Sequence, residues 1–386
     1  MQFVYFGNDW FADNRTSSHH IARRLGAKFP LLYIETPGLR SPNASGRDIR
    51  KLFRKLARAF RPPELVAPHL WVMTLPQIPF HRFAIVQAVN QALSRIRVRQ
   101  AIRRIGFRDV ITWFHVPHPG FLAHQLGERL TVFYCIDEYA KLPDVDTRSI
   151  EDMDRRLTSV ADIVFVCSKG LLDSHLPLNG NTRLSPHGVD ADLFGRAEDE
   201  ETQTPPETRD WTRPIIGFWG LVDRWVDLSI IEHIARSRPD WTLVFIGRTA
   251  VDVSALKVLE NIHFVGTKPY SALPGWAKAI DVCILPFAQN SLMLNSSPLK
   301  LREYLATGRP IVSVPLPDVK QFGDLVGTAC DGPAFVKAIA ECLSQNTREK
   351  SALRRKAVAG CTWDATVTNI VANLEVELSA RGLDIG

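Results

Sequence analysis

Short runs of β-favouring apolar residues alternate with helix-like patterns along the whole chain. The runs in the first half are FVYF, LLYIE, WVMTL, VITWF, TVFYC and IVFVC, and those in the second half are IIGFW, TLVFI, IHFVG, VCILP and PIVSV. Continuous apolar runs of this length are typical of parallel strands that helices cover on both faces. The predicted fold class is therefore α/β, with doubly wound sheets.

A polar, acidic and proline-containing segment separates the two sets of runs. It has no hydrophobic periodicity, and it begins at residue 195. A chain of 386 residues is long for one compact domain and comfortable for two. We predict an N-terminal Rossmann-like domain over residues 1–194, a linker over 195–213 and a C-terminal Rossmann-like domain over 214–386. The last helical pattern, residues 363–381, can pack on either domain.

Open parallel sheets bind ligands beyond the carboxyl ends of their strands. Two such domains that face each other would form a central cleft between those ends. The residues that directly follow each apolar run are therefore the candidates for function.

The basic residues are concentrated near the N-terminus. Residues 1–108 contain 19 Lys and Arg but only 5 Asp and Glu. Within them, residues 47–61 place apolar side chains at helical spacing and basic side chains on the other face, as in helices that bind anionic membrane surfaces. Arginines between residues 95 and 108 could extend this patch. A solvated surface helix and a nucleic-acid-binding helix are the two alternatives.

No apolar run reaches the length of a membrane-spanning helix, and no export signal can be recognised. The six cysteines are scattered, without a CxxC pair, which indicates a reduced cytoplasmic protein with no structural zinc. DxD triplets occur three times, so none of them is informative. We expect no metal site and metal-independent chemistry.

One segment combines a helix start with charges suited to a nucleotide. Ser297 and Pro298 are good residues for the beginning of a helix, and the free N–H groups there favour a phosphate. Lys300 adds a positive charge on the first turn. Glu303 lies on the same face, where a carboxylate could accept hydrogen bonds from ribose hydroxyls. The alternative is a capped surface helix with a Lys300–Glu303 ion pair.

The stretch SPLKLREYLATGRPIVSVPLPDV resembles the donor-binding signature of GT-B glycosyltransferases, the group 1 superfamily. The resemblance implies two Rossmann-like domains facing a cleft and a nucleotide-sugar donor, a UDP- or GDP-sugar, with no resident cofactor. Glu303 matches the second glutamate of that signature, and Asn295 replaces the first. This departure leaves the donor sugar and the stereochemistry open. The donor residues expected from the residues and the resemblance together are Gly220, Arg224, Thr267, Lys268, Tyr270, Asn295, Ser296, Ser297, Lys300 and Glu303.

The run TVFYC ends in Ile136, Asp137 and Glu138. VFYCIDE, followed downstream by SPHGVDADLF, resembles the xanthan-type glucuronosyltransferases, and this resemblance implies that Asp137 is the general base. A capping aspartate in a turn is the alternative. On the acceptor side we expect Asn14, Arg15 and His115.

The sequence thus predicts a glycosyltransferase, for hexosyl or uronosyl groups, that acts on a lipid-linked saccharide in cell-surface polysaccharide biosynthesis. It would lie at the inner face of the membrane as a peripheral protein, without binding nucleic acid. Two alternatives stay open. One is a nucleotide-sugar 2-epimerase of the same fold, and the other is a non-catalytic nucleotide-sugar-binding or scaffold protein.

Overall fold

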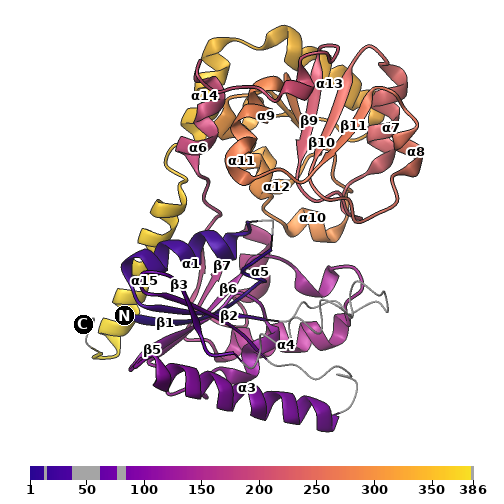
Figure 1. Ribbon diagram of the computed structural model, residues 1–386. Helices are drawn as coiled ribbons and strands as arrows, with labels where there is room; N and C mark the ends of the chain where they lie inside the picture. Colours follow the sequence, from indigo (N-terminus) through magenta and orange to yellow (C-terminus); the bar gives the residue numbers. More distant parts are fainter. Residues whose placement is uncertain (13–14, 37–60, 76–83, 384–386) are drawn as a thin grey trace. The chain divides into compact units, whose positions relative to one another are not determined.

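The computed structural model describes residues 1–12, 15–36, 61–75 and 84–383 (Figure 1). The chain forms two compact units. The first comprises residues 1–186 and 366–386, and the second comprises residues 187–365. Each unit contains one sheet with helices on both faces. Among the described residues, no helix combines the length and the apolar character that crossing a bilayer requires.

The first unit contains an eight-stranded sheet in the order β3-β4-β2-β1-β5-β6-β7-β8. All neighbouring strands are parallel except β3 and β4, which form an antiparallel pair at one edge. The strands are β1 (Gln2–Gly7), β2 (Leu31–Glu35), β3 (Glu64–Ala67), β4 (Leu70–Thr74), β5 (Val110–Phe114), β6 (Leu130–Cys135), β7 (Ile163–Val166) and β8 (Thr182–Leu184).

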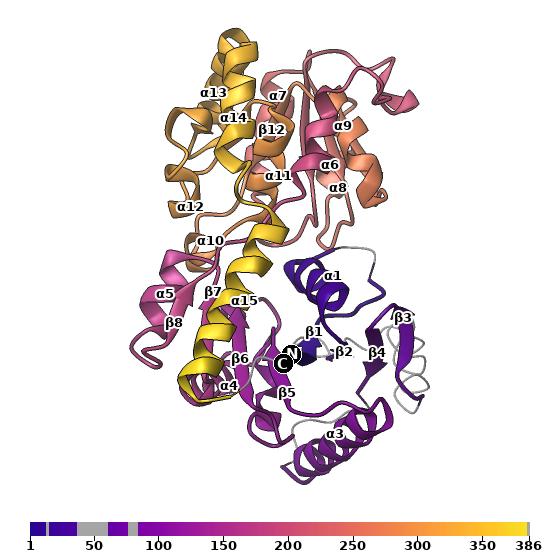
Figure 2. The same cartoon turned by 90° about the vertical axis from the view of Figure 1, so that its left-hand side faces the viewer.

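The helices of the first unit are α1 (Ser17–Lys28), α3 (Ala84–Arg104), α4 (Thr147–Val160) and α5 (Lys169–His175). The last helix, α15 (Trp363–Ala380), begins in the second unit, and from residue 366 onward it belongs to the first. Asn181 beside β8 donates a 2.9 Å hydrogen bond to Glu377 of α15, and Arg381 pairs with Asp162 at 2.6 Å. Figure 2 shows α15 running along this sheet.

Alternating residues of the first sheet face different helix layers. On one face, the rings of Tyr33, Tyr5 and Trp113 stack across three neighbouring strands with centroids 5.3 and 5.4 Å apart, and the Tyr33 hydroxyl hydrogen-bonds Ser18 of α1. On the other face, Phe6 stacks on Phe114 in one core cluster with buried residues of α3. Both faces are therefore covered, which is why the strands read as continuous apolar runs.

The second unit contains a six-stranded, fully parallel sheet in the order β11-β10-β9-β12-β13-β14. The chain reverses its direction of winding between β9 and β12, which is the topological switch point at which such sheets bind nucleotides. The strands are β9 (Ile215–Trp219), β10 (Thr242–Ile246), β11 (Ile262–Gly266), β12 (Val282–Leu285), β13 (Ile311–Ser313) and β14 (Gly327–Thr328).

The helices of the second unit cover both faces of its sheet (Figure 1). They are α6 (Ala191–Gly195), α7 (Leu228–Ser237), α8 (Ser254–Lys257), α9 (Leu273–Ala279), α10 (Ser291–Asn295), α11 (Leu299–Thr307), α12 (Pro317–Lys320), α13 (Gly332–Gln345) and α14 (Arg348–Val358).

The predicted α/β architecture of doubly wound sheets is confirmed, and each of the eleven apolar runs corresponds to a strand. The strands β3, β8 and β14 were not predicted. Two of these contain three residues or fewer, and β3 is largely exposed, so none of them produces a long apolar run.

Residues 195–213, predicted as a linker, lie within the second unit rather than between the units. Trp211 stacks on His263 with centroids 4.5 Å apart, and the Lys278 ammonium donates to the carbonyl oxygens of Asp199 and Glu200. A few anchoring contacts thus hold a polar segment that has no periodicity. The chain passes between the units at residues 186/187 and 365/366 instead.

Two glycines bring the ends of β9 and β10 together. Gly220 and Gly247 have φ values of 147° and 141°, and a Cβ on Gly247 would stand 2.0 Å from the carbonyl oxygen of Gly220. We expect Gly247→Ala to destabilise the protein by about 2 kcal/mol or more, through backbone strain and this collision. Thermal unfolding measures the effect.

Gly180→Ala is the matched control, because a Cβ at Gly180 would meet nothing within 4 Å. Equal melting temperatures for the two variants would contradict the close approach.

Candidate functional site

The carboxyl end of β9, beside the switch point, carries a buried carboxylate. Glu303 of α11 accepts hydrogen bonds from the indole N–H of Trp219, at 2.7 Å, and from the ammonium of Lys300, at 3.1 Å. The backbone N–H of Trp219 donates to the hydroxyl of Tyr304 at 3.1 Å, so α11 is fixed to the end of the strand at two adjacent positions. Lys300 and Glu303 lie three residues apart and therefore share one face of the helix.

Glu303 is only 6% exposed, and both hydrogen bonds end on the same oxygen, Oε2. No described residue bonds to Oε1. Burial of a carboxylate is unfavourable unless charge and hydrogen bonds compensate it, and Lys300 supplies the charge. The arrangement fixes the carboxylate while leaving one oxygen for a further donor.

Lys300 lies directly over the turn that follows β9. A Cβ on Gly220 would stand 3.3 Å from Lys300 Cε, so a larger residue at this position would crowd the lysine. The Lys300 side chain is about one-quarter exposed, and its ammonium is therefore accessible from solvent. A positive charge, a glycine turn and a helix N-terminus meet here, which is the chemistry of a diphosphate site.

Ser297 has a different role from the predicted helix cap. The helix α11 begins at Leu299 with Pro298 at the N-cap, and its cap has no side-chain hydrogen bond. The Ser297 hydroxyl donates to Asp318 at 3.0 Å and accepts from Arg302 at 2.9 Å. The buried Arg302–Asp318 ion pair thus fixes the loop before α11, and the hydroxyl is already engaged.

Three of the expected donor residues, Thr267, Lys268 and Tyr270, follow β11. Tyr270 packs edge-on against Phe194 at 5.6 Å, and Lys268 pairs with Glu207 at 3.2 Å and lies over the Trp276 ring. Thr267 is exposed. The structure thus gives Lys268 and Tyr270 local packing partners.

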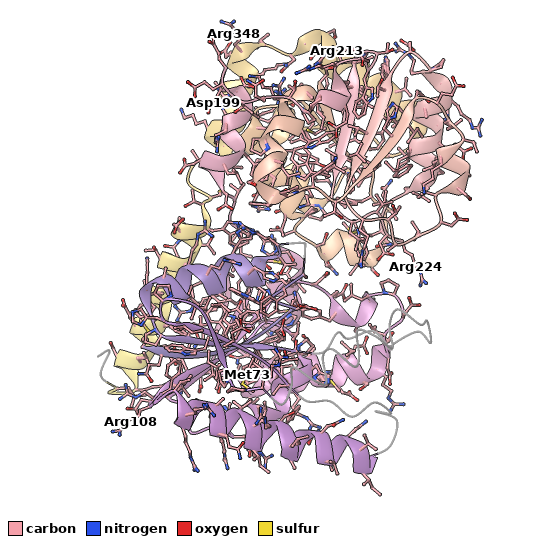
Figure 3. The ribbon with its side chains drawn as sticks, viewed as in Figure 1. Met73, Arg108, Asp199, Arg213, Arg224 and Arg348 are labelled. Atoms are coloured by element: carbon pink, nitrogen blue, oxygen red, sulfur yellow. The ribbon has the colours of Figure 1, made fainter. Side chains whose placement is uncertain are left out.

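The other expected donor residues lie in two loops. Arg224 is exposed, and Figure 3 shows its side chain pointing outward from the second unit. Asn295 ends α10 and is half-buried, and the Ser296 hydroxyl donates to the carbonyl oxygen of Met293 at 2.9 Å. Among the described residues, Trp219 and Lys300 hydrogen-bond Glu303, and these three residues do not.

In the first unit, Asp137 follows β6 at the carboxyl edge of the sheet. One of its carboxylate oxygens accepts the N–H of Glu138 at 3.0 Å. Burial raises the pKa of Asp137 to about 7, which the Glu138 N–H opposes and the Glu138 charge reinforces. A carboxyl group with this pKa can take up a proton near neutral pH, as a general base must.

The structure brings together Cys135, Asp154 and His175, a group that the sequence spacing did not reveal. His175 lies 3.1 Å from Asp154 through Nε2, and its Nδ1 contacts the carbonyl oxygen of Leu171. Burial lowers the pKa of His175, but the hydrogen bond and charge of Asp154 outweigh this effect and the net pKa is raised. A buried histidine–aspartate ion pair explains this group.

Of the three predicted acceptor residues, the structure describes His115 and Arg15. His115 is fully buried, and its ring nitrogens contact the hydroxyls of Tyr5 and Ser17 at 3.1 Å each, so direct contact with an acceptor would require these hydrogen bonds to open. Arg15 is exposed just before α1. Asn14 and nearly all of the predicted basic helix 47–61 lie outside the described residues.

Three residues that support the site at Glu303, and one buried carboxylate of the first unit, were not predicted from the sequence. Trp219 holds Glu303, and Arg302 and Asp318 hold the loop before α11. Glu35, at the carboxyl end of β2, is buried and accepts hydrogen bonds from Trp10 N–H and the Thr74 hydroxyl, and burial raises its pKa. An acidic residue at the end of the apolar run LLYIE was the available signal for Glu35.

Comparison with known proteins identifies the class of the chain. Residues 213–345 match the family described as glycosyl transferases group 1. TuaH of Bacillus subtilis (strain 168) is described as a proposed teichuronic acid biosynthesis glycosyltransferase. It is 25% identical to this chain over 377 residues, which cover 84% of this chain and 94% of TuaH.

Two solved structures illustrate the similarity in fold. Sucrose-phosphate synthase from Thermosynechococcus elongatus has a TM-score of 0.74 at 15% identity and covers 98% of this chain and 100% of its own. HepE from Anabaena, solved in complex with UDP, has a TM-score of 0.67 at 13% identity and covers 97% of this chain and 100% of its own. These findings confirm the predicted GT-B fold and glycosyltransferase class.

The raised pKa of Asp137 predicts a pH-dependent stability. The folded protein holds this proton more tightly than the unfolded chain, so ionisation of Asp137 reduces stability as pH rises from about 4 through about 7. We expect Asp137→Asn to raise the free energy of unfolding at pH 8 by on the order of 2 kcal/mol and to have little effect near pH 4. Denaturant titrations at the two pH values measure this difference.

The exposed Asp173→Asn serves as the matched control. The same pH-dependent gain in both variants, or no gain in Asp137→Asn, would contradict the burial of Asp137.

Proposed function

We propose that this glycosyltransferase binds a UDP- or GDP-sugar in its second unit and transfers the sugar to an acceptor hydroxyl deprotonated by Asp137 of its first unit. The observation that carries the proposal is the Glu303 carboxylate, buried at the switch point and fixed by Trp219 and Lys300. In the proposal, Oε1 of Glu303 accepts hydrogen bonds from the ribose of the nucleotide. The UDP complex of HepE supports a uridine nucleotide.

The diphosphate of the donor would lie against Gly220 and the first turn of α11. Lys300 and the helix N-terminus supply positive charge there, which favours the dianionic diphosphate as it leaves the sugar. In this proposal the leaving group is stabilised by these groups without a metal. Asp318 and Arg302 act indirectly, because they hold the loop that leads into α11.

The proposed acceptor is a lipid-linked saccharide in the assembly of a cell-surface polysaccharide. The teichuronic acid description of TuaH supports the polysaccharide, and the basic N-terminal quarter of the chain supports an acceptor at an anionic membrane surface. The protein would then be a peripheral protein at the inner face of the membrane.

Donor binding should depend on Lys300. We expect Lys300→Ala to weaken the binding of UDP or GDP by about tenfold or more, because it removes the charge nearest the diphosphate site. Lys337→Ala is the matched control, since Lys337 lies on the exposed side of α13. Isothermal titration calorimetry measures both affinities, after a thermal-shift screen of UDP-, GDP- and dTDP-sugars has identified the donor.

Trp219→Phe extends this test to the carboxylate. This substitution keeps a ring beside Phe194 but removes the indole N–H that holds Glu303. The affinity for UDP or GDP should therefore fall while the fold is retained. Unchanged affinity in both Lys300→Ala and Trp219→Phe would disprove the donor site.

Transfer should depend on Asp137. We expect Asp137→Asn to bind the donor normally and to lose at least about a hundredfold in turnover, because amide cannot accept the proton. In the parent protein, kcat/KM should fall as pH decreases through about 7. Turnover assays with product analysis measure both.

Near-normal turnover by Asp137→Asn would show that Asp137 is not the general base. An altered donor sugar formed without any acceptor would indicate the 2-epimerase instead, and donor binding without any turnover would indicate the scaffold protein.

A further inference from the structure

The helix α3 is apolar on two opposite sides. Its buried side faces the core of the first unit through Val98, Ala101 and Ile102. On the outer side, Ile85 and Ile96 are 79% and 53% exposed, and Val89 between them is 45% exposed. At about 100° per residue, Val98 lies about 200° around the helix from Ile96. The exposed apolar residues therefore do not belong to the edge of the core.

The exposed residues form a continuous stripe. Ile85, Val89, Ala92 and Ile96 are separated by four, three and four residues, which places them on one face of the helix. Figures 1 and 2 show α3 at the outside of the first unit, and no described helix or strand covers its outer side. We call these four residues the α3 stripe.

Positive charge continues the stripe. The helix contains five arginines and no acidic residue, and Arg103 and Arg104 form its last turn. Arg99 donates two hydrogen bonds to the carbonyl oxygen of Gln125, which is an uncharged acceptor. No described carboxylate pairs with Arg99, Arg103 or Arg104.

We infer that the outer face of α3 docks on an anionic lipid bilayer, with the α3 stripe among the acyl chains and the arginines at the phosphates. Aliphatic side chains along the middle of the face favour lipid over nucleic acid, whose binding sites use exposed aromatics and polar side chains. A second copy of α3 would offer no acidic side chain to pair with these arginines, because the helix contains none. The inference extends the proposed membrane location to a described surface.

The test uses the full chain, with neither donor nor acceptor present. Its failure is therefore distinguishable from a failure of the proposed transferase activity. Co-sedimentation is measured with phosphatidylcholine vesicles and with vesicles containing about one-quarter phosphatidylglycerol, at about 100 mM salt. We expect binding to the anionic vesicles, and weaker binding as salt increases.

The variant Ile85→Ser/Val89→Ser/Ile96→Ser should bind the anionic vesicles about tenfold or more weakly. Its matched control, Leu65→Ser/Val258→Ser/Val376→Ser, removes three comparably exposed apolar side chains elsewhere and should bind as the parent does. Since all six positions are exposed, thermal unfolding should be nearly unchanged. Arg99→Gln/Arg103→Gln/Arg104→Gln should lose at least about tenfold, and its remaining binding should depend less on salt.

Several results would overturn the inference. They are undiminished vesicle binding by the stripe variant, equal losses in the stripe and control variants, or no binding by the parent. A change of mass in sedimentation caused by the stripe variant alone, with vesicle binding retained, would assign the face to a second copy. Binding of short single-stranded or duplex oligonucleotides in place of vesicles would assign it to nucleic acid.

Discussion

The hydrogen bond from the Trp219 indole to the Glu303 carboxylate connects the last residue of β9 to α11. A strand end and a helix from a later αβ unit meet here, at the position where the sheet reverses its winding. The carboxylate tolerates burial because Lys300 supplies charge and Trp219 supplies a donor. The absence of a side chain at Gly220 leaves room for Lys300 above the same turn. The proposed donor site therefore depends on several packed contacts rather than on a mobile loop.

The sheets could be predicted because their strands are buried on both faces. Tyr5, Phe6, Trp113 and Phe114 are all apolar in large part and all buried, so no alternation with polar residues interrupts the pattern. The Lys300–Glu303 pair could also be predicted, since three residues of helix place both side chains on one face. Local spacing was sufficient in these cases.

Contacts between distant residues could not be predicted in the same way. Trp219 looked like the end of an ordinary strand, and only the fold shows that its indole reaches Glu303, 84 residues away. Serine is a residue type that favours a helix cap, but the Ser297 hydroxyl hydrogen-bonds Asp318 and Arg302 instead. His115 follows a strand, as functional residues often do, yet it turns into the core toward Tyr5. The direction of a side chain after a strand depends on neighbours that the sequence does not identify.

The path of the C-terminal segment has a consequence for dissecting the protein. The chain leaves the first unit at residue 186 and returns to it at 366. The second unit is therefore an insert within the first, and cutting the chain at one point does not separate the two units. A fragment that stops before α15 would leave the partners of Leu374 and Leu378 bare and Asp162 without Arg381. Exchanging donor-side units between relatives would therefore be done by replacing an internal insert, with both junctions retained, rather than by joining two halves.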